Sequence, residues 1–200
     1  MARRLISTGC ATLPRRAAYA GTADRATSVC RFWQLAPLGP VHLLMTSRFA
    51  DRYAKEFLAG WGAMDFNGHM ANSAYLNLAA DVRMAFFAEH GFPPREFRRL
   101  ALGPVVRKDE LECFREVGLH ETVTVTYAAL AMSSDGARFV VENEIWSAAG
   151  ERAATVRSTG GWLDVRERKL IAPPPALLAA FQQVPRVPGF VELPLVRGGP

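Results

Sequence analysis

Four polar side chains capable of acid–base chemistry or hydrogen bonding lie within eight residues of this chain. They are Asp65, Asn67, His69 and Asn72, and Gly68 stands among them. Residues 62–70 carry no helical or strand pattern, so these side chains are predicted to project from a loop just before a helix. A carboxylate there can attack a carbonyl carbon or remove a proton from water. The segment from Asp65 to Tyr75 is therefore the candidate catalytic segment.

The predicted helix start adds a second chemical element to this segment. The first turn of a helix has unpaired backbone N–H groups and a partial positive charge, which stabilise an oxyanion formed on a carbonyl. Gly68 has no side chain, so a substrate can approach the backbone closely there. Asn72 and Ser73 offer an N-cap for the helix.

The surrounding sequence predicts one long helix and a set of strands. Apolar residues at spacings of three and four indicate a helix from Asn72 to about His90, with an apolar face that includes Tyr75 and Phe86. Gly91 ends it, and Pro93-Pro94 is expected to prevent its resumption. We predict strands at residues 49–61, 104–114, 121–132, 137–147 and 151–165, and a short helix at 176–183.

One long apolar helix beside one antiparallel sheet is an α+β arrangement. A single sheet wrapped around one helix leaves edge hydrogen bonds unpaired, and pairing with a second copy would satisfy them. We therefore expect at least a dimer. The predicted domain spans residues 48–183, and residues 184–200, rich in Pro and Gly, are expected to form an irregular tail.

Residues 1–47 are expected to be a disordered or non-native extension. They lack periodic patterning, and Met45 is a possible initiator; an organelle transit peptide is the alternative, since the segment is rich in Arg. Residues 1–50 hold seven arginines and one acidic residue, whereas the remaining 150 hold 17 basic and 18 acidic residues. The net charge of +5 thus lies outside the predicted domain, which argues against nucleic-acid binding.

The remaining composition excludes several other classes. The three cysteines are widely spaced and form no CxxC pair, so neither a disulfide framework nor a metal site is predicted, and a reducing, cytoplasmic location fits best. No apolar run approaches the ~20 residues needed to span a bilayer. No cofactor is expected.

Several motifs resemble the hotdog-fold acyl-CoA thioesterases, the 4-hydroxybenzoyl-CoA thioesterase-like group. They are Trp61-Gly62-Ala63-Met64-Asp65, Asn67-Gly68-His69, Asn72 and Tyr75, then Gly103-Pro104-Val105-Val106, Asn143-Glu144-Ile145-Trp146 and Gly160-Gly161-Trp162-Leu163-Asp164. The Asp-x-Asn-x-His spacing is also similar to the catalytic segment of plant acyl-carrier-protein thioesterases.

The resemblance implies a hotdog fold, an antiparallel sheet curled around one central helix, assembled as a homodimer or homotetramer. It implies hydrolysis of an acyl-CoA or acyl-carrier-protein thioester, with Asp65 as the catalytic carboxylate assisted by Asn67 and His69. Gly68, Asn72 and Tyr75 are assigned to substrate binding. Cations for the CoA phosphates are available at Arg107-Lys108 and at Arg166, Arg168 and Lys169.

The sequence leaves alternatives open. Asp65 can act as nucleophile or general base, or serve only as a cap, and Asp81 on the helix is a possible second acid. Relatives that act on aromatic thioesters tend to have an aliphatic residue at the position of His69, and the plant enzymes contain two repeats rather than one. A hotdog protein that binds acyl-CoA without cleaving it and a hotdog hydratase are the alternative functions.

Overall fold

The computed structural model describes residues 48–195, which belong to one compact unit. The expectations for residues 1–47 and for the last five residues lie outside this range. The strands are β1 (Tyr53–Leu58), β2 (Leu102–Cys113), β3 (Thr122–Ser133), β4 (Arg138–Ser147), β5 (Arg152–Asp164), β6 (Lys169–Ile171) and β7 (Arg186–Leu193). The helices are the short 3-10 turn η1 (Trp61–Ala63), α2 (Asn72–Glu89), α3 (Pro94–Leu100) and α4 (Pro175–Phe181).

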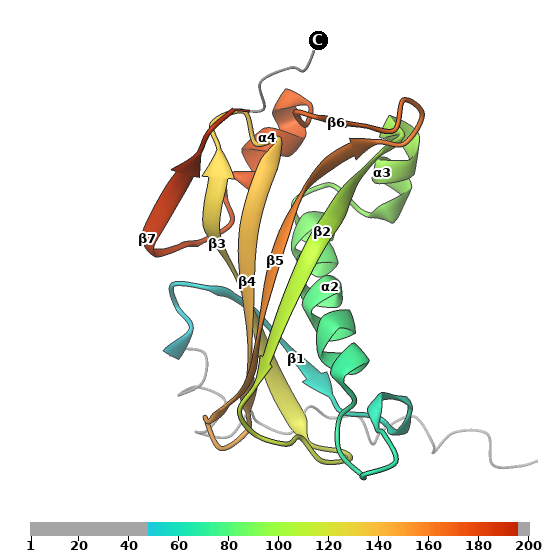
Figure 1. Ribbon diagram of the computed structural model, residues 1–200, viewed down its shortest axis with the longest axis vertical. Coiled ribbons are helices and arrows are strands. Elements are labelled where there is room, and N and C mark those ends of the chain that lie inside the picture. The colour runs from blue at the N-terminus through green and yellow to red at the C-terminus, as the bar shows by residue number, and fades with distance from the viewer. Residues whose placement is uncertain (1–47, 196–200) are drawn as a thin grey trace, which may run out of the picture. The chain divides into compact units, whose positions relative to one another are not determined.

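Within the described residues, all seven strands join one sheet. Its main order is β1-β3-β4-β5-β2 with antiparallel neighbours; β6 is antiparallel to β5, and β7 is parallel to β3. The long helix α2 lies along one face of the curved strands (Figure 1). This is the predicted α+β hotdog arrangement, one antiparallel sheet around one long helix.

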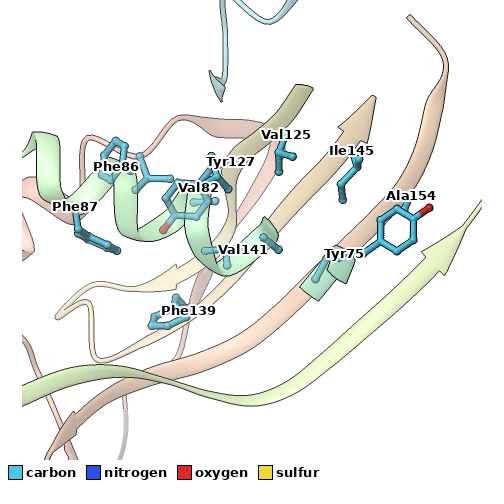
Figure 2. Packing of buried hydrophobic residues seen from close by; sticks show 14 of the residues in the cluster. Tyr75, Val82, Phe86, Phe87, Val125, Tyr127, Phe139, Val141, Ile145 and Ala154 are labelled. Carbon is cyan, nitrogen blue, oxygen red and sulfur yellow. The ribbon is translucent and has the colours of Figure 1, made fainter. Parts of the chain in front are cut away.

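The core lies between α2 and the sheet, as the helical periodicity predicts. Figure 2 shows Val82 and Phe86 of α2 near Tyr127 of β3, with Val141 of β4 in the same cluster. The rings of Phe86 and Tyr127 are 5.5 Å apart and nearly perpendicular, a favourable aromatic geometry. Burying a large apolar side chain contributes about 1.5–3 kcal/mol, so this contact fixes the helix on the sheet.

The start of α2 differs from the prediction. The N-cap position is Ala71, no side chain caps the helix, and Asn72 is already its first helical residue. Backbone hydrogen bonds hold the entry instead: Met70 N donates to Val117 O (2.8 Å) and Ala71 N donates to Ala63 O (2.9 Å). The expected N-cap role of Asn72 is therefore wrong, because contacts distant in sequence determine where the helix begins.

A glycine allows β5 to approach β2 closely. A methyl group on Gly160 would overlap the carbonyl oxygen of Val105 and lie 2.9 Å from the ring of Phe139. Only a residue without a side chain fits between these two neighbours without moving the backbone.

Three elements of the structure were not predicted. A separate short helix, α3, begins at Pro94, because proline is tolerated at the first helical position. Lys169–Ile171 form the short strand β6. Residues 186–193, expected to be irregular, form β7, and the first strand is shorter than predicted, at Tyr53–Leu58. None of the helices in residues 48–195 is long and apolar enough to cross a membrane.

Candidate active site

The predicted catalytic loop is a tight turn with its own backbone hydrogen bonds. Asp65 N donates to His69 O (2.9 Å), and Gly68 N donates to Asp65 O (3.1 Å). Gly68 has a φ of 87°, a left-handed conformation that favours glycine. Gly68 is therefore required for the turn itself, in addition to any role in substrate approach.

Asn67 holds the carboxylate of Asp65. Its backbone N–H donates to Asp65 Oδ1 (2.8 Å) and its side-chain Nδ2 donates to Oδ2 (3.4 Å). The Asp65 side chain keeps 28% of its surface exposed, so the carboxylate is oriented by the turn and still reachable. This arrangement suits a positioned nucleophile or base.

His69 lies between two carboxylates. Its Nδ1 is 3.9 Å from Asp65 Oδ1, and its Nε2 is 3.6 Å from Glu116 Oε1. Both distances exceed a direct hydrogen bond, so the ring is placed close to both acids without being bonded to either. The structure thus places His69 near Asp65, and it adds Glu116, which was not predicted.

Glu116 comes from the loop between β2 and β3, far along the chain from the Asp65 turn. A backbone bridge between His69 and Gly118, next to the Met70–Val117 hydrogen bond, brings that loop to the turn. Glu121 Oε2 accepts a hydrogen bond from Gly118 N (3.0 Å) and so stabilises the same loop. No local motif around Glu116 marks it, which is why the sequence alone did not identify it.

Two cavities adjoin the turn and divide the predicted site residues between them. One, of about 440 Å³, has Asp65 and Gly68 in its wall; its other lining residues are Trp61, Met64, Phe66 and Leu119. The other, of about 250 Å³, is lined by His69, Met70, Asn72, Tyr75, Cys113, Phe114, Arg115 and Glu116. The six predicted site residues thus lie in one region of the fold, with Asn67 bonded to Asp65.

The larger cavity has an unusually apolar rim. Trp61 and Phe66 are 80% and 97% exposed, and Leu119 is also exposed. Large apolar side chains grouped on a surface usually mark a site of ligand or protein contact. Here they surround the carboxylate of Asp65.

The helix end and Tyr75 supply hydrogen-bond donors to the smaller cavity. Because no side chain caps α2, amide groups in its first turn are left for another acceptor. Burial, and secondly the negative charge of nearby Cys113, Glu121 and Glu116, raises the pKa of Tyr75 to about 12. The phenol therefore stays protonated at neutral pH. Burial also raises the pKa of the Cys113 thiol, which disfavours the nucleophilic thiolate.

The remaining predicted residues do not join this site. Asp81 is exposed on α2, and Arg107 and Lys108 are exposed on β2, where Lys108 forms an ion pair with Glu110 (2.8 Å). Three further cations are exposed at the turn between β5 and β6, at the opposite end of the sheet from the start of α2 (Figure 1): Arg166, Arg168 and Lys169. Among residues 48–195, no cluster of His, Cys, Asp or Glu is arranged to hold a metal ion.

Comparison with solved structures finds the same fold in several proteins. A hypothetical protein of Staphylococcus aureus, solved in complex with CoA, is 20% identical with a TM-score of 0.60, covering 66% of this chain and 82% of that one. A 1,4-dihydroxy-2-naphthoyl-CoA thioesterase from Synechocystis is 13% identical with a TM-score of 0.60, covering 66% and 96%. A DHNA-CoA thioesterase from Staphylococcus aureus is 18% identical with a TM-score of 0.61, covering 66% and 89%.

At these identities the structures establish the fold, and the predicted hotdog architecture is confirmed. No curated protein sequence matches the chain. A family model described as the thioesterase-like superfamily matches residues 59–181, which include the Asp65 turn, all of α2 and the four long strands. The match covers more than half of the chain and confirms the resemblance inferred from its motifs. This chain belongs to the thioesterase-like superfamily.

Proposed function

We propose that this protein is an acyl-CoA thioesterase in which Asp65 is the catalytic carboxylate. The observation that carries the proposal is the position of Asp65: an oriented, accessible carboxylate in the wall of an apolar cavity, on the turn that leads into the uncapped start of α2. Membership of the thioesterase-like superfamily supports the reaction class. The CoA thioesterases among the structural neighbours support CoA as the thiol carrier, with a carrier-protein thioester as the alternative.

The reaction consumes one water molecule and yields a carboxylic acid and a free thiol. In the general-base route, Asp65 removes a proton from a water that attacks the thioester carbonyl. In the nucleophilic route, Asp65 attacks first and forms a mixed anhydride, which water then cleaves. In both routes the carbonyl oxygen becomes negative, and the free amides at the start of α2 are suitable donors for it.

The other site residues take supporting roles in this proposal. Asn67 orients the carboxylate, and His69 assists at the carbonyl or the water. Gly68, Asn72 and Tyr75 contact the substrate, with the protonated Tyr75 as a donor. The apolar rim around Asp65 is suited to an acyl chain. Burial of apolar surface favours binding by about 25 cal/mol per Å².

The test is a free-thiol assay of the purified protein with short, long and aromatic acyl-CoA substrates. Asp65→Asn is expected to lower turnover by about 10²–10⁴-fold, because the amide keeps the shape but loses the charge needed for either route. Asp81→Asn is the matched control, since it removes an exposed acid on the neighbouring helix, and it should keep wild-type turnover.

The outcomes separate the alternatives. Near-normal turnover in Asp65→Asn together with loss in Asp81→Asn would make Asp81 the catalytic acid. Tight binding of acyl-CoA without release of thiol by the wild type would favour a non-catalytic binding protein. Hydration of an enoyl-CoA in place of thiol release would favour the hydratase.

A further inference from the structure

A third cavity, of about 200 Å³, lies between α2 and the sheet. Its wall is largely aromatic, formed by Phe87, Tyr127, Phe139, Trp162 and Phe181. Among the described residues that line it, Arg83 alone is charged. These wall residues all differ from those that line the two cavities beside Asp65. Arg83 lies in the second half of α2, several helical turns from the end of the helix that faces the Asp65 turn.

A chain of hydrogen bonds holds the guanidinium of Arg83 in place. Nη1 of Arg83 donates to Ser158 Oγ on β5 (2.5 Å), and Ser158 Oγ donates to Asp109 Oδ1 on β2 (2.5 Å). Because the Ser158 proton is engaged by Asp109, the lone pairs of its hydroxyl face Arg83. The guanidinium is therefore positioned from one side, and its other N–H groups need further acceptors.

The charge of Arg83 lacks a direct counter-ion. Within residues 48–195, no carboxylate forms an ion pair with it, and Asp109 reaches it only through the neutral Ser158. Burial lowers the pKa of Arg83, although an arginine remains charged in a protein. A partly buried cation in an apolar wall is costly unless an anion or several hydrogen bonds compensate it.

Tyr127 and Trp162 provide neutral polar groups in the same wall. Tyr127 is 1% exposed and lines the cavity together with Arg83. Burial raises the pKa of Tyr127, so the hydroxyl is protonated and can donate. The indole Nε1 of Trp162 is buried and has no hydrogen-bond partner among the described residues. A cation, the neutral Tyr127 hydroxyl and the unpaired N–H of Trp162 in one apolar cavity match a ligand with an apolar body and a single anionic acceptor group.

We propose that this cavity is a separate binding site for a small carboxylic acid, held as its anion by Arg83 and Tyr127. The size of the cavity limits the apolar part of the ligand. For comparison, an apolar cavity of roughly 150 Å³ binds one benzene molecule. The cavity beside Arg83, at about 200 Å³, therefore accommodates one six-membered ring with a carboxylate. The site does not depend on Asp65 or on thioester cleavage. It would make the protein responsive to free acids of this size.

Calorimetric titration of the full chain with cyclohexanecarboxylate tests the proposal, with the uncharged cyclohexanecarboxamide as the matched probe. The wild type should bind the acid at least tenfold more tightly than the amide, because hydrogen bonds to charged groups are the stronger ones. Arg83→Gln should weaken binding of the acid at least tenfold and abolish the preference for the acid over the amide. Arg98→Gln, which removes an exposed arginine on α3, should change neither affinity.

Tyr127→Phe removes one hydroxyl from the wall and keeps the ring, so it tests the site even if Arg83→Gln does not fold. The Tyr127→Phe variant should bind the acid several-fold more weakly than the wild type. The proposal is overturned if the wild type binds neither probe at millimolar concentration, or binds both equally. It is also overturned if both wall variants bind the acid like the wild type. Asp65→Asn should bind the acid normally, so failure here and failure of the proposed thioesterase give different results.

Discussion

At the residue scale, the distances around Asp65 indicate how much each neighbouring side chain contributes to catalysis. Asn67 forms both of the hydrogen bonds that orient the carboxylate, whereas the His69 ring lies just beyond hydrogen-bond distance of Asp65 and of Glu116. A group that is not hydrogen-bonded to the carboxylate in the resting protein contributes to catalysis through orientation or charge. Its removal should therefore lower the catalytic rate less than removal of the base itself. These distances predict that substitution of Asp65 lowers the catalytic rate most, and that substitution of His69 or Glu116 lowers it less.

His69→Ala is expected to lower kcat by about tenfold, less than the 10²–10⁴-fold expected for loss of the catalytic acid or base. Glu116→Gln should have an effect of only a few-fold, because the Glu116 side chain is 79% exposed and solvent screens its charge. Steady-state kinetics with the best acyl-CoA provides the measurement, with Glu112→Gln, an exposed acid on β2, as the control. A loss in His69→Ala as large as that in Asp65→Asn would make His69 the essential base.

The sequence identified the residues of the Asp65 turn because they are contiguous and precede a recognisable helix. It could not identify Glu116 or Arg83 as members of cavities, because their partners are far along the chain: His69 lies in the turn before α2, and Ser158 lies on β5. The structure turns Arg83 inward toward Ser158 on β5. Side-chain chemistry is local in sequence, whereas a cavity wall depends on which strands are neighbours.

At the element scale, the turn between β3 and β4 provides a test of stability. Asp135 Oδ1 accepts hydrogen bonds from Ser133 Oγ (2.6 Å) and Ala137 N (3.0 Å), and these bonds lower the pKa of Asp135. A carboxylate with a lowered folded-state pKa stabilises the fold above its ordinary pKa of about 3.9, and loses that effect as the pH falls through the lowered value.

Asp135→Asn should therefore reduce the free energy of unfolding by roughly 0.5–1 kcal/mol at pH 7, since the amide oxygen accepts more weakly than a carboxylate. The difference from the wild type should shrink as the pH falls below about 4. Urea unfolding at several pH values measures both effects. Asp51→Asn, at an exposed position, is the control; an equal loss in that variant would show that general charge, not the turn, is responsible.

The long elements were predictable because period-two and period-3.6 patterns are strong over long segments. The predicted boundaries of β3, β4 and β5 lie within one residue of the observed ones. β7 was missed because Pro188 and Gly189 break the pattern. They are tolerated because β7 pairs on one side only, and its register jumps from Arg186 to Val191.

At the scale of the whole molecule, the sheet has a long open edge. β2 pairs only with β5 among the described strands, and its twelve residues are mostly exposed, including the apolar Val106. We expect this edge to pair with a second copy, so that the protein is a homodimer, or a homotetramer built from such dimers.

Sedimentation equilibrium at micromolar concentration should give a dimer or larger. Val106→Lys should shift the population toward monomer, because a lysine on an edge strand opposes pairing. Val191→Lys places the same charge on β7, at the other edge of the sheet, and should leave the assembly unchanged. The opposite pattern would move the interface to β7, and a monomeric wild type would contradict the expected assembly.

The second edge of the sheet is built from both ends of the described chain. β1 covers the first half of β3, and β7 covers the second half. Residues 186–193 are synthesised after all the other strands, so the half of the β3 edge that β7 covers stays unpaired until then. The last strand then closes the sheet. Cells that make this protein should therefore show aggregation of chains that stop before residue 186, even though such chains contain the entire Asp65 turn.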